Sequence, residues 1–486
     1  MAAAAFIDLD RTLLSGASGP VITASLRAAR LVPQSFPGES LIYRIFNTVG
    51  ETLPSMLLAR QGATAMKGKS QRLVRDAARN AIPELTTLVQ PFARQMIDKH
   101  RAAGDKLVLA TTTPYDFIEE FARSLGFDDV IGTRFEVDAG GLYTGELDGR
   151  FVWSGGKLAA VSDWCSSNGM NVADCAAYTD SIYDSPLLEA VGSPHVVNPD
   201  ARLQVLAAAR RWPILNLDVS PGVVKVPVIG TELQKLALTF ARPELIPFAK
   251  FTIDGTHNIP ADGPAILVGN HRSYFDVFAV SLTVAKTGRT VRFLGKKEVF
   301  DAPVIGQLAA ALGGIRVDRG TGSDAPLDAA AAALEAGEMV AIMPQGTIPR
   351  GRAFFDPALQ GRWGAARLAM RTGAPVIPMG LWGTEKVWPR NSQVPMLWNV
   401  TNPPKVSVTV GPEVALRRDA TSDALASAAD ALADDNTKRM MSAIINLLPP
   451  EAREHREPTE AELRAALPSN YKGDLNAEFT RRPGTD

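Results

Sequence analysis

Short apolar runs alternate with helical patterns along most of the chain, and this alternation limits the possible folds more than any other feature. In the first two hundred residues the strand-like runs are Phe6 to Ile7, Leu107 to Ala110, Ala176 to Tyr178 and His195 to Val197. Such a rhythm is typical of a parallel α/β sheet whose helices link and cover the strands. We therefore expect a Rossmann-like parallel sheet within residues 1–212.

One long interruption separates the first two of these runs. Residues from about 15 to 82 lack strand signals and carry amphipathic helical stretches, such as 41–46 and 71–81. Helical periodicity without strands indicates a helical insertion into the α/β unit. We interpret these residues as a helical cap.

A second series of strands follows a connector, residues 213–250, that is rich in proline and glycine. Its strand-like runs are Ala265 to Val268, Val291 to Leu294, Met339 to Met343, Pro375 to Met379 and Val406 to Val410. Helical patterns lie at 325–336, 362–371 and 420–448. We expect a second α/β domain over 251–450 and a charged, loosely packed tail at 451–486.

Composition narrows the class of protein. The 486 residues fit two or three domains of roughly 100–200 residues each. The net charge of -1, from 51 basic and 52 acidic residues, argues against a general nucleic-acid binder. The two cysteines match no metal or redox spacing, which indicates a reducing compartment. The cysteines therefore favour a cytoplasmic protein. Because the sequence has no apolar run of about eighteen residues, we expect any membrane contact to be peripheral, on the inner face of the cell membrane.

Two aspartates, Asp8 and Asp10, follow the first strand. Side chains two positions apart in an extended chain point the same way, so both carboxylates leave the strand toward one site. Adjacent carboxylates repel one another unless a cation or different roles separate them. Other polar residues follow later strands or glycines in order: Thr111, Lys157, Asp180 and Asp184.

This ordered set resembles the haloacid dehalogenase superfamily of phosphatases, and the helical insertion resembles the cap of its phosphoserine-phosphatase-like branch. The resemblance spans roughly residues 4–212. It implies that Asp8 is the nucleophile that forms an aspartyl-phosphate and that Asp10 is the general acid and base. It also implies that Thr111 and Lys157 hold the phosphoryl oxygens of a phosphomonoester substrate.

The same resemblance implies a magnesium site. Its ligands would be Asp8, Asp10, Asp180 and Asp184. Oxygen ligands suit Mg²⁺, and the ion together with a lysine offsets the charge that would keep a carboxylate away from a phosphate dianion. Thr179 and Tyr183 depart from the usual pattern of the branch, but neither removes a catalytic group.

In the second half, His271 is followed five positions later by Asp276. A step of five residues on an ideal helix turns through about 500°, which leaves the two side chains about 140° apart. They can meet only if His271 precedes a helix and Asp276 lies on its first turns. An imidazole paired in this way with a buried carboxylate is a general base.

The histidine motif, together with blocks at 314–319, 343–347 and 376–380, resembles the glycerol-phosphate and lysophosphatidate acyltransferase family. The resemblance implies transfer of a fatty acyl group from acyl-CoA or acyl carrier protein to a lysophospholipid, 1-acylglycerol 3-phosphate. His271 would take the hydroxyl proton and Asp276 would orient the ring.

The acceptor residues are also implied by this resemblance. Arg319, with Arg316, would hold the acceptor's phosphate, since guanidinium groups bind phosphate through charge-assisted hydrogen bonds. Three residues of the third block would shape the acceptor site: Gln345, Gly346 and Thr347.

The third block departs from its family, which usually has Pro-Glu-Gly-Thr-Arg. This chain has Gln345 for the acid and Ile348 for the arginine. Glutamine keeps the side-chain length and a carbonyl acceptor, and Arg350 with Arg352 just beyond would supply positive charge. Alternatively, the acceptor is a different alcohol or lysophospholipid.

The connector also carries an apolar helical pattern, 232–240, with Lys235, Arg242 and Lys250 alongside. That composition suits a helix lying in a membrane interface, and the alternative is that it packs on the acyltransferase core. Lys296 and Lys297 are either surface residues or contacts for coenzyme A phosphates.

Together these features predict a bifunctional enzyme, a Mg²⁺-dependent phosphatase fused to an acyltransferase of phospholipid synthesis. One alternative keeps the acyltransferase and makes the first domain a non-catalytic regulatory module. Another is a non-enzymatic protein of lipid surfaces. The fusion further suggests that the phosphatase acts on a lipid phosphate.

Overall fold

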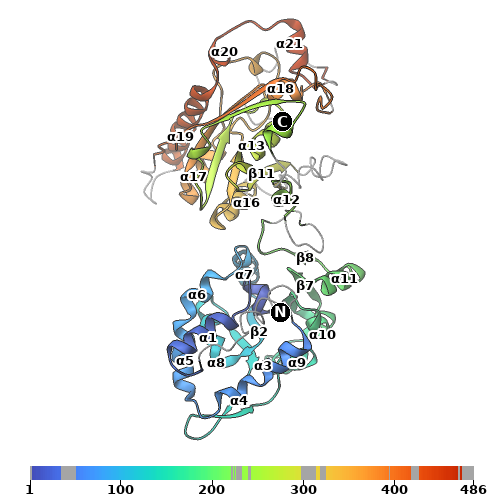
Figure 1. Cartoon of the computed structure of the whole chain (residues 1–486), viewed down its shortest axis with the longest axis vertical. Coiled ribbons are helices and arrows are strands. Elements are labelled where there is room, and N and C mark those ends of the chain that lie inside the picture. Colours follow the sequence, from blue (N-terminus) through green and yellow to red (C-terminus); the bar gives the residue numbers. More distant parts are fainter. Residues whose placement is uncertain are drawn as a thin grey trace. The chain divides into compact units, whose positions relative to one another are not determined.

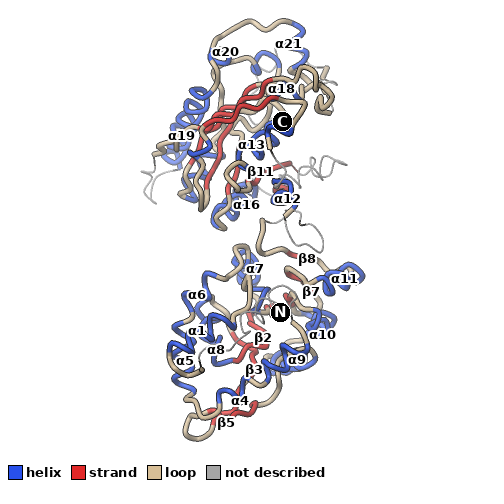
Figure 2. The backbone as a smooth tube through the Cα atoms, in the orientation of Figure 1, coloured by secondary structure: helices blue, strands red, loops and turns tan. Residues whose placement is uncertain are grey.

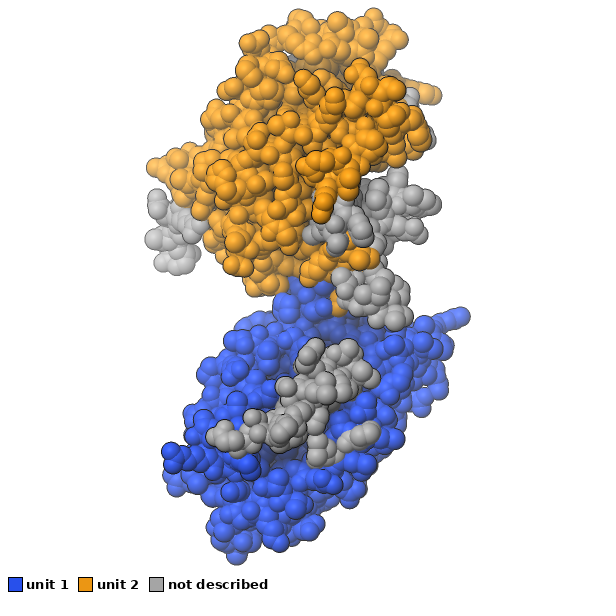
Figure 3. Space-filling model, viewed as in Figure 1, with its two compact units in different colours: residues 1–221 blue, residues 222–486 orange. Residues whose placement is uncertain are grey.

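The structure is a computed structural model that describes residues 3–33, 51–220, 223, 225, 232–238, 242–296, 313–317, 325–392, 394–417, 426–468 and 471–472. The chain divides into two compact units, unit 1 at residues 1–221 and unit 2 at residues 222–486 (Figure 3). Figure 1 labels many of the elements of both units.

Unit 1 is built on a six-stranded parallel sheet with the strand order β3-β2-β1-β6-β7-β8. Its strands are β1 (Ala4–Ile7), β2 (Lys106–Pro114), β3 (Asp129–Thr133), β6 (Ala176–Thr179), β7 (Ser193–Val197) and β8 (Ile214–Leu215). The four predicted runs form β1, β2, β6 and β7. The expected Rossmann-like fold class is therefore confirmed, although β3 and β8 were not predicted.

Helices cover this sheet and leave its strands buried. On one face, Phe6 and Val108 belong to a core shared with α9 (Gly155–Ser167), α10 (Ser185–Ala190) and α11 (Ala201–Arg210). Two further helices, α7 (Ala93–Ala103) and α8 (Tyr115–Ser124), pack against β2. Burial on both sides explains why β1 and residues 107–110 of β2 are continuous apolar runs instead of alternating with polar residues.

The insertion after β1 is helical, as expected. It contains α1 (Gly19–Ala28), α3 (Leu53–Arg60), α4 (Gly62–Met66), α5 (Gln71–Asn80) and α6 (Ile82–Thr87). The predicted stretch 71–81 corresponds to α5, and 41–46 lies outside the described residues. An unpredicted antiparallel hairpin, β4 (Phe135–Val137) with β5 (Tyr143–Leu147), packs against α4.

Unit 2 has a seven-stranded sheet with the order β12-β11-β13-β10-β14-β15-β9, parallel except between β14 and β15. Its strands are β9 (Lys250–Asp254), β10 (Ala265–Gly269), β11 (Val291–Lys296), β12 (Gly314–Val317), β13 (Met339–Ile342), β14 (Val376–Trp382) and β15 (Lys405–Val410). The five predicted runs are strands, so the second α/β fold is confirmed, while β9 and β12 were not predicted.

Alternate residues of the central strand β10 enter two separate cores. Ile266 and Val268 face a core formed with α16 (Ala325–Glu335), α17 (Gly364–Thr372) and α19 (Ala426–Leu447). Ala265 and Leu267 face the other core, which includes α13 (Asp276–Ala285). Figure 2 shows the strands between α19 and α13, which makes unit 2 a three-layer structure. None of its described helices, nor those of unit 1, is long and apolar enough to cross a bilayer.

The connector joins unit 2 through polar side chains. Glu232 precedes α12 (Leu233–Leu238), and its Oε2 lies 2.8 Å from the NH1 of Arg292 on β11. The NH2 of Arg292 lies 2.7 Å from Oε1 of Glu338, and Gln234 donates to the carbonyl of Val291 at 3.2 Å. These contacts favour the packing alternative for the connector over an interfacial helix.

Part of the C-terminal tail is also packed. It contains α20 (Pro450–Arg453) and α21 (Glu460–Ala465), and α21 begins with a capping box between Thr459 and Glu462. Ala466 lies in a small buried cluster with Ile348 and Phe354. The expectation of a loosely packed tail therefore does not hold for this segment.

Arg292→Met should destabilise unit 2 because it leaves Glu232 and Glu338 without their common cation. Breaking a buried ion pair from one side costs about 3–5 kcal/mol. Urea denaturation followed by hydrogen exchange in β11 peptides would measure this separately from unit 1. As a control, Arg371→Met removes an ion pair whose arginine is 51% exposed and should cost about 1 kcal/mol or less. Equal losses in the two variants would contradict the structural role of Arg292.

Candidate active sites

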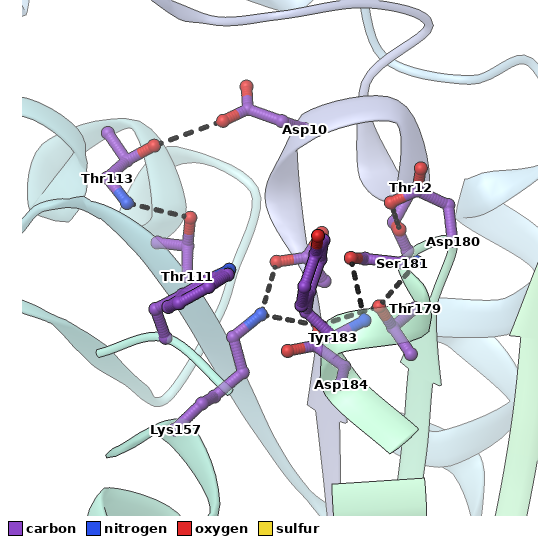
Figure 4. Close-up of polar contacts among 12 residues, drawn as sticks. Asp10, Thr12, Thr111, Thr113, Lys157, Thr179, Asp180, Ser181, Tyr183 and Asp184 are labelled. Carbon is purple, nitrogen blue, oxygen red and sulfur yellow. Dashed lines mark hydrogen bonds and ion pairs between the residues drawn. The ribbon is translucent and has the colours of Figure 1, made fainter. Parts of the chain in front are cut away.

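The first site lies at the C-terminal ends of β1, β2 and β6, where the predicted acids meet (Figure 4). Asp8 directly follows β1, and its backbone N–H donates to the carbonyl of Tyr178 in β6 at 2.9 Å. The chain then turns sharply, since Leu13 N–H donates back to the Asp8 carbonyl at 3.2 Å. This turn holds the Asp8 carboxylate at the edge of the sheet, where it is almost completely buried.

Lys157, near the start of α9, connects two of the acids. Its Nζ donates to Oδ1 of Asp8 at 2.9 Å and to Oδ2 of Asp184 at 2.6 Å. Burial alone would lower the pKa of Lys157, but the carboxylates of Asp184, Asp8 and Glu51 outweigh burial and raise it. The lysine therefore stays positively charged in the site.

The acids outnumber the cations that neutralise them. Burial raises the pKa of Asp8 to about 7, with Lys157 opposing the rise and Asp184 and Glu51 adding to it. Burial also raises the pKa of Asp180 well above its usual range, although Arg11 lies 3.2 Å away from its Oδ2. Carboxylates with raised pKa values are short of nearby positive charge.

Asp10 points to a different part of the site. Its Oδ1 accepts from the backbone N–H of Ser18 at 2.5 Å, and its Oδ2 accepts from the hydroxyl of Thr113 at 3.2 Å. The Thr113 N–H donates in turn to Oγ1 of Thr111 at 3.1 Å. Figure 4 shows Asp10 and Thr113 on the opposite side of the site from Asp184. Burial raises the pKa of Asp10, so this carboxyl group is suited to carry a proton.

The acids of this site have the chemistry of a divalent-metal site. Among the described residues no three His, Cys, Asp or Glu side chains already form a ligand group. However, Oδ1 of Asp184 is buried and has no hydrogen-bond partner there. All the donors are carboxylate oxygens, which suit Mg²⁺. The carboxylates of Asp8, Asp180 and Asp184 therefore fit the ion. The Asp10 carboxylate accepts hydrogen bonds from Ser18 and Thr113, and its place among the ligands stays a prediction.

Sequence reasoning missed Glu51 of the helical insertion. Its Oε2 accepts from the Ser181 hydroxyl at 2.7 Å and from Nε1 of Trp153 at 3.1 Å. Burial, followed by the charge of Asp184, raises its pKa. Glu51 lies 130 positions from Ser181, and no local pattern links the two. The cap therefore contributes an acidic group to the core of the site.

The second site contains His271 and Asp276 in the predicted arrangement. His271 follows β10, Asp276 is the first residue of α13, and Nδ1 of the ring lies 2.8 Å from Oδ2 of the carboxylate. The same oxygen accepts from the backbone N–H groups of Arg272 at 2.7 Å and Ser273 at 2.9 Å. Because a carboxylate there requires a proton on Nδ1, Nε2 is left as the basic nitrogen.

Two further contacts fix the turn that carries His271. The side chain of Asn270 donates to the carbonyl of Leu381 and accepts from its N–H, both at 2.8 Å, which ties the turn to β14. The Ser273 hydroxyl donates to the carbonyl of Trp388 at 2.7 Å. Neither contact was predicted from the sequence, because the partners are backbone groups more than a hundred positions away.

Gln345, one of the departures from the family pattern, contacts the histidine directly. Its Oε1 accepts from the backbone N–H of His271 at 2.7 Å. Next to it, Gly346 has φ of 74°, and a Cβ there would lie 3.0 Å from the side chain of Arg362. A glycine is needed at this position, and half-buried Thr347 follows it.

The predicted acceptor arginines are only partly described. Arg319 and the side chain of Arg316 lie outside the described residues, as do Lys297 and the side chain of Lys296. Arg350 is half-buried, and Arg352 forms an ion pair with Glu457 of the tail at 2.6 Å. A cation that was not predicted, buried Arg390, donates to the carbonyls of Ile348 and Pro349.

Comparisons with known proteins agree with this division. The haloacid dehalogenase-like hydrolase family matches residues 5–189 and the acyltransferase family matches residues 250–382. The inhibition of morphological differentiation protein of Streptomyces azureus is 31% identical over 216 residues, covering 44% of this chain and 78% of that protein. The chain belongs to the haloacid dehalogenase-like hydrolase family.

This haloacid dehalogenase-like chain is also similar to a second curated protein and to a solved structure. The phosphoserine phosphatase SerB1 of Mycobacterium tuberculosis is 29% identical over 242 residues, covering 47% of this chain and 75% of that protein. The crystal structure of the 1-acyl-sn-glycerophosphate acyltransferase PlsC of Thermotoga maritima is 21% identical, with a TM-score of 0.30, and covers 44% of this chain and 74% of that chain. The two family matches make this protein a phosphomonoester hydrolase fused to an acyltransferase.

Lys157→Met should destabilise metal-free unit 1, because Asp8 and Asp184 would lose the ammonium group between them. We expect a loss of about 3–5 kcal/mol, measured by urea denaturation with hydrogen exchange in β1 peptides. Magnesium chloride should restore part of the loss by binding the exposed carboxylates. Lys106→Met, whose ion pair with Asp128 is 54% exposed at the lysine, should change stability by about 1 kcal/mol or less. A Lys157→Met protein as stable as this control would disprove the role assigned to Lys157.

Proposed function

We propose that unit 1 hydrolyses a phosphomonoester through an aspartyl-phosphate and that unit 2 acylates a lysophospholipid. The acyl donor would be acyl-CoA or acyl carrier protein, and the acceptor would be 1-acylglycerol 3-phosphate. The observation that carries the acyltransferase proposal is the convergence of three donors on one oxygen of Asp276, which fixes the His271 ring.

In unit 1, a carboxylate oxygen of Asp8 would attack phosphorus while the bond to the leaving alkoxide breaks. Lys157 and Thr111 would bind the phosphoryl oxygens, and Lys157 already lies 2.9 Å from Asp8. Asp10 would give its proton to the alkoxide and then take one from the water that cleaves the aspartyl-phosphate. Magnesium, held by Asp8, Asp180 and Asp184, would supply the charge that lets an anionic nucleophile approach a phosphate dianion.

In unit 2, Nε2 of His271 would take the proton of the acceptor hydroxyl as its oxygen attacks the thioester carbonyl. The thiolate would then leave and receive that proton from the imidazolium. Asp276 would stabilise the imidazolium through the 2.8 Å hydrogen bond to Nδ1. Gln345 would keep the ring in place by accepting from the backbone N–H of His271.

The acceptor's phosphate would be bound by Arg316, Arg319 and Arg350. The burial of Ile348 against Phe354 and Ala466 favours a second candidate, a different alcohol or lysophospholipid, because an apolar side chain replaces a cation there. Competition between 1-acylglycerol 3-phosphate and monoacylglycerol for radiolabelled acyl-CoA tests this choice. A preference for the phosphate-bearing acceptor supports the first candidate, and its absence supports the second.

We also propose that the phosphatase substrate is a lipid phosphate. The support is the fusion of a phosphomonoester hydrolase to an acyltransferase in one chain. Phosphate release from phosphatidate, with phosphoserine as comparator, is the direct assay. Release from phosphoserine alone would refute the proposal.

Asp8→Asn and His271→Ala should separate the two activities. Asp8→Asn should lower phosphate release by about a thousandfold or more and leave acyl transfer unchanged, because the amide is a poor nucleophile. His271→Ala should lower acyl transfer by about a hundredfold to ten-thousandfold and leave phosphate release unchanged. Loss of both activities in either variant, or normal acyl transfer in His271→Ala, would contradict the assignment of two sites.

Substitutions at Gln345 should test the backbone contact with His271. Gln345→Leu leaves the His271 N–H without its acceptor, and we expect kcat/KM for acyl transfer to fall about tenfold or more. Gln345→Glu keeps a carbonyl-type acceptor and should stay within about threefold of wild type. If both variants lost activity equally, the hydrogen bond would not be the function of this side chain.

A further inference from the structure

Unit 2 exposes a group of large apolar side chains between α18 (Thr384–Val387) and β15. Residues 394–400, here called the apolar loop, read Val-Pro-Met-Leu-Trp-Asn-Val. Their exposed members are Trp398 at 77%, Val394 at 57%, Val400 at 52%, Met396 at 42% and Leu397 at 41%. Single exposed apolar residues are common on proteins, but a contiguous group of them marks an interaction surface.

The base of the apolar loop is anchored to the body of unit 2. The N–H of Met396 donates to the carbonyl of Val387 at 2.8 Å, and Nε1 of Trp388 donates to the carbonyl of Ser392 at 3.1 Å. The Ser392 hydroxyl donates to the carbonyl of Val394 at 2.7 Å. The loop therefore presents its apolar side chains from a fixed base.

Trp388, which anchors the apolar loop, also contacts the turn that carries His271. The Ser273 hydroxyl donates to the carbonyl of Trp388, and the ring of Tyr274 lies 5.6 Å from that of Trp388. Tyr274 is itself 51% exposed. The turn that carries His271 and the apolar loop therefore share one anchor, so a surface bound by the loop would lie close to that turn.

The charge of the surrounding segment has one sign. Residues 386–405 contain no aspartate or glutamate, and of their three cations Arg390 is buried. Lys386 and Lys405 are exposed and flank the loop in the sequence. This composition is complementary to an anionic surface.

We propose that the apolar loop inserts into the surface of an anionic phospholipid bilayer, with Lys386 and Lys405 at the headgroups. The inference rests on the proposed acylation of a lipid at His271, because membrane contact beside that residue gives it direct access to an amphipathic acceptor. A bilayer suits the loop better than a protein partner does. Residues 394–400 carry one polar side chain, Asn399, and the exposed charges that flank them are lysines, which suits an apolar interior beneath anionic headgroups.

Flotation of the full-length protein with vesicles of phosphatidylglycerol and phosphatidylcholine would test the proposal. The double variant Leu397→Ser, Trp398→Ser should bind about tenfold more weakly or worse, since it removes much of the inserted apolar area. Leu245→Ser is the matched control, because Leu245 is 67% exposed but lies in the connector. Circular dichroism would establish that both variants fold.

Wild-type binding by the double variant would overturn the proposal, and so would an equal loss in Leu245→Ser. The protein should bind vesicles of phosphatidylcholine alone more weakly. Equal binding to both compositions would overturn the proposed preference for anionic lipid. If light scattering showed that the double variant breaks a dimer while vesicle binding persists, the loop would instead be a contact between two copies.

Flotation does not depend on acyl transfer, so the two proposals can fail separately. A wild-type protein that floats but does not acylate any lysophospholipid would refute only the proposed function. A protein that acylates its acceptor while the double variant floats normally would refute only the role of the loop. With a short-chain, water-soluble acceptor, the double variant should keep wild-type activity, because residues 397 and 398 have no part in the chemistry.

Discussion

Burial of carboxylates at the C-terminal ends of central strands is the constraint on which both halves of this chain depend. Asp8 follows β1 and Asp276 begins the helix after β10, and both are almost completely removed from water. An ionised carboxylate in such a place costs several kcal/mol unless cations or hydrogen bonds compensate for the lost water. Lys157 provides this compensation at Asp8, and hydrogen-bond donors provide it at Asp276, so the two sites meet the requirement differently.

At Asp276 the compensation comes from backbone N–H groups and the imidazole on one oxygen, which makes this carboxylate a rigid support. At Asp8 the neighbours include Asp184 and Glu51, and Lys157 does not prevent a rise in pKa. A carboxylate whose charge is compensated, such as Asp276, orients another group. A carboxylate whose charge is not fully compensated, such as Asp8, still attracts positive charge. This difference supports a positioning role for Asp276 and a metal-assisted role for the acids of unit 1.

Sequence patterns predicted the inner strands of both sheets but missed the four edge strands, β3, β8, β12 and β9. The strand β3 contains Asp129 and Gly132, and β9 has alternating burial at an edge, so neither gives a continuous apolar run. Asp8 and His271 were predicted as site residues because their partners lie nearby in the sequence or follow a family pattern. Glu51 was not predicted because the fold brings it to Ser181 across 130 positions, and no local spacing links the two residues.

The altered third block of unit 2 packs against the C-terminal tail. Ile348 replaces an arginine of the family pattern and packs with Phe354 of the same loop and Ala466, which directly follows α21. An arginine at 348 would place a charge in this apolar cluster, where it would have to be paired or would displace the tail. The isoleucine and the packed tail therefore depend on each other, so the acceptor site of this chain cannot be inferred from the third block alone.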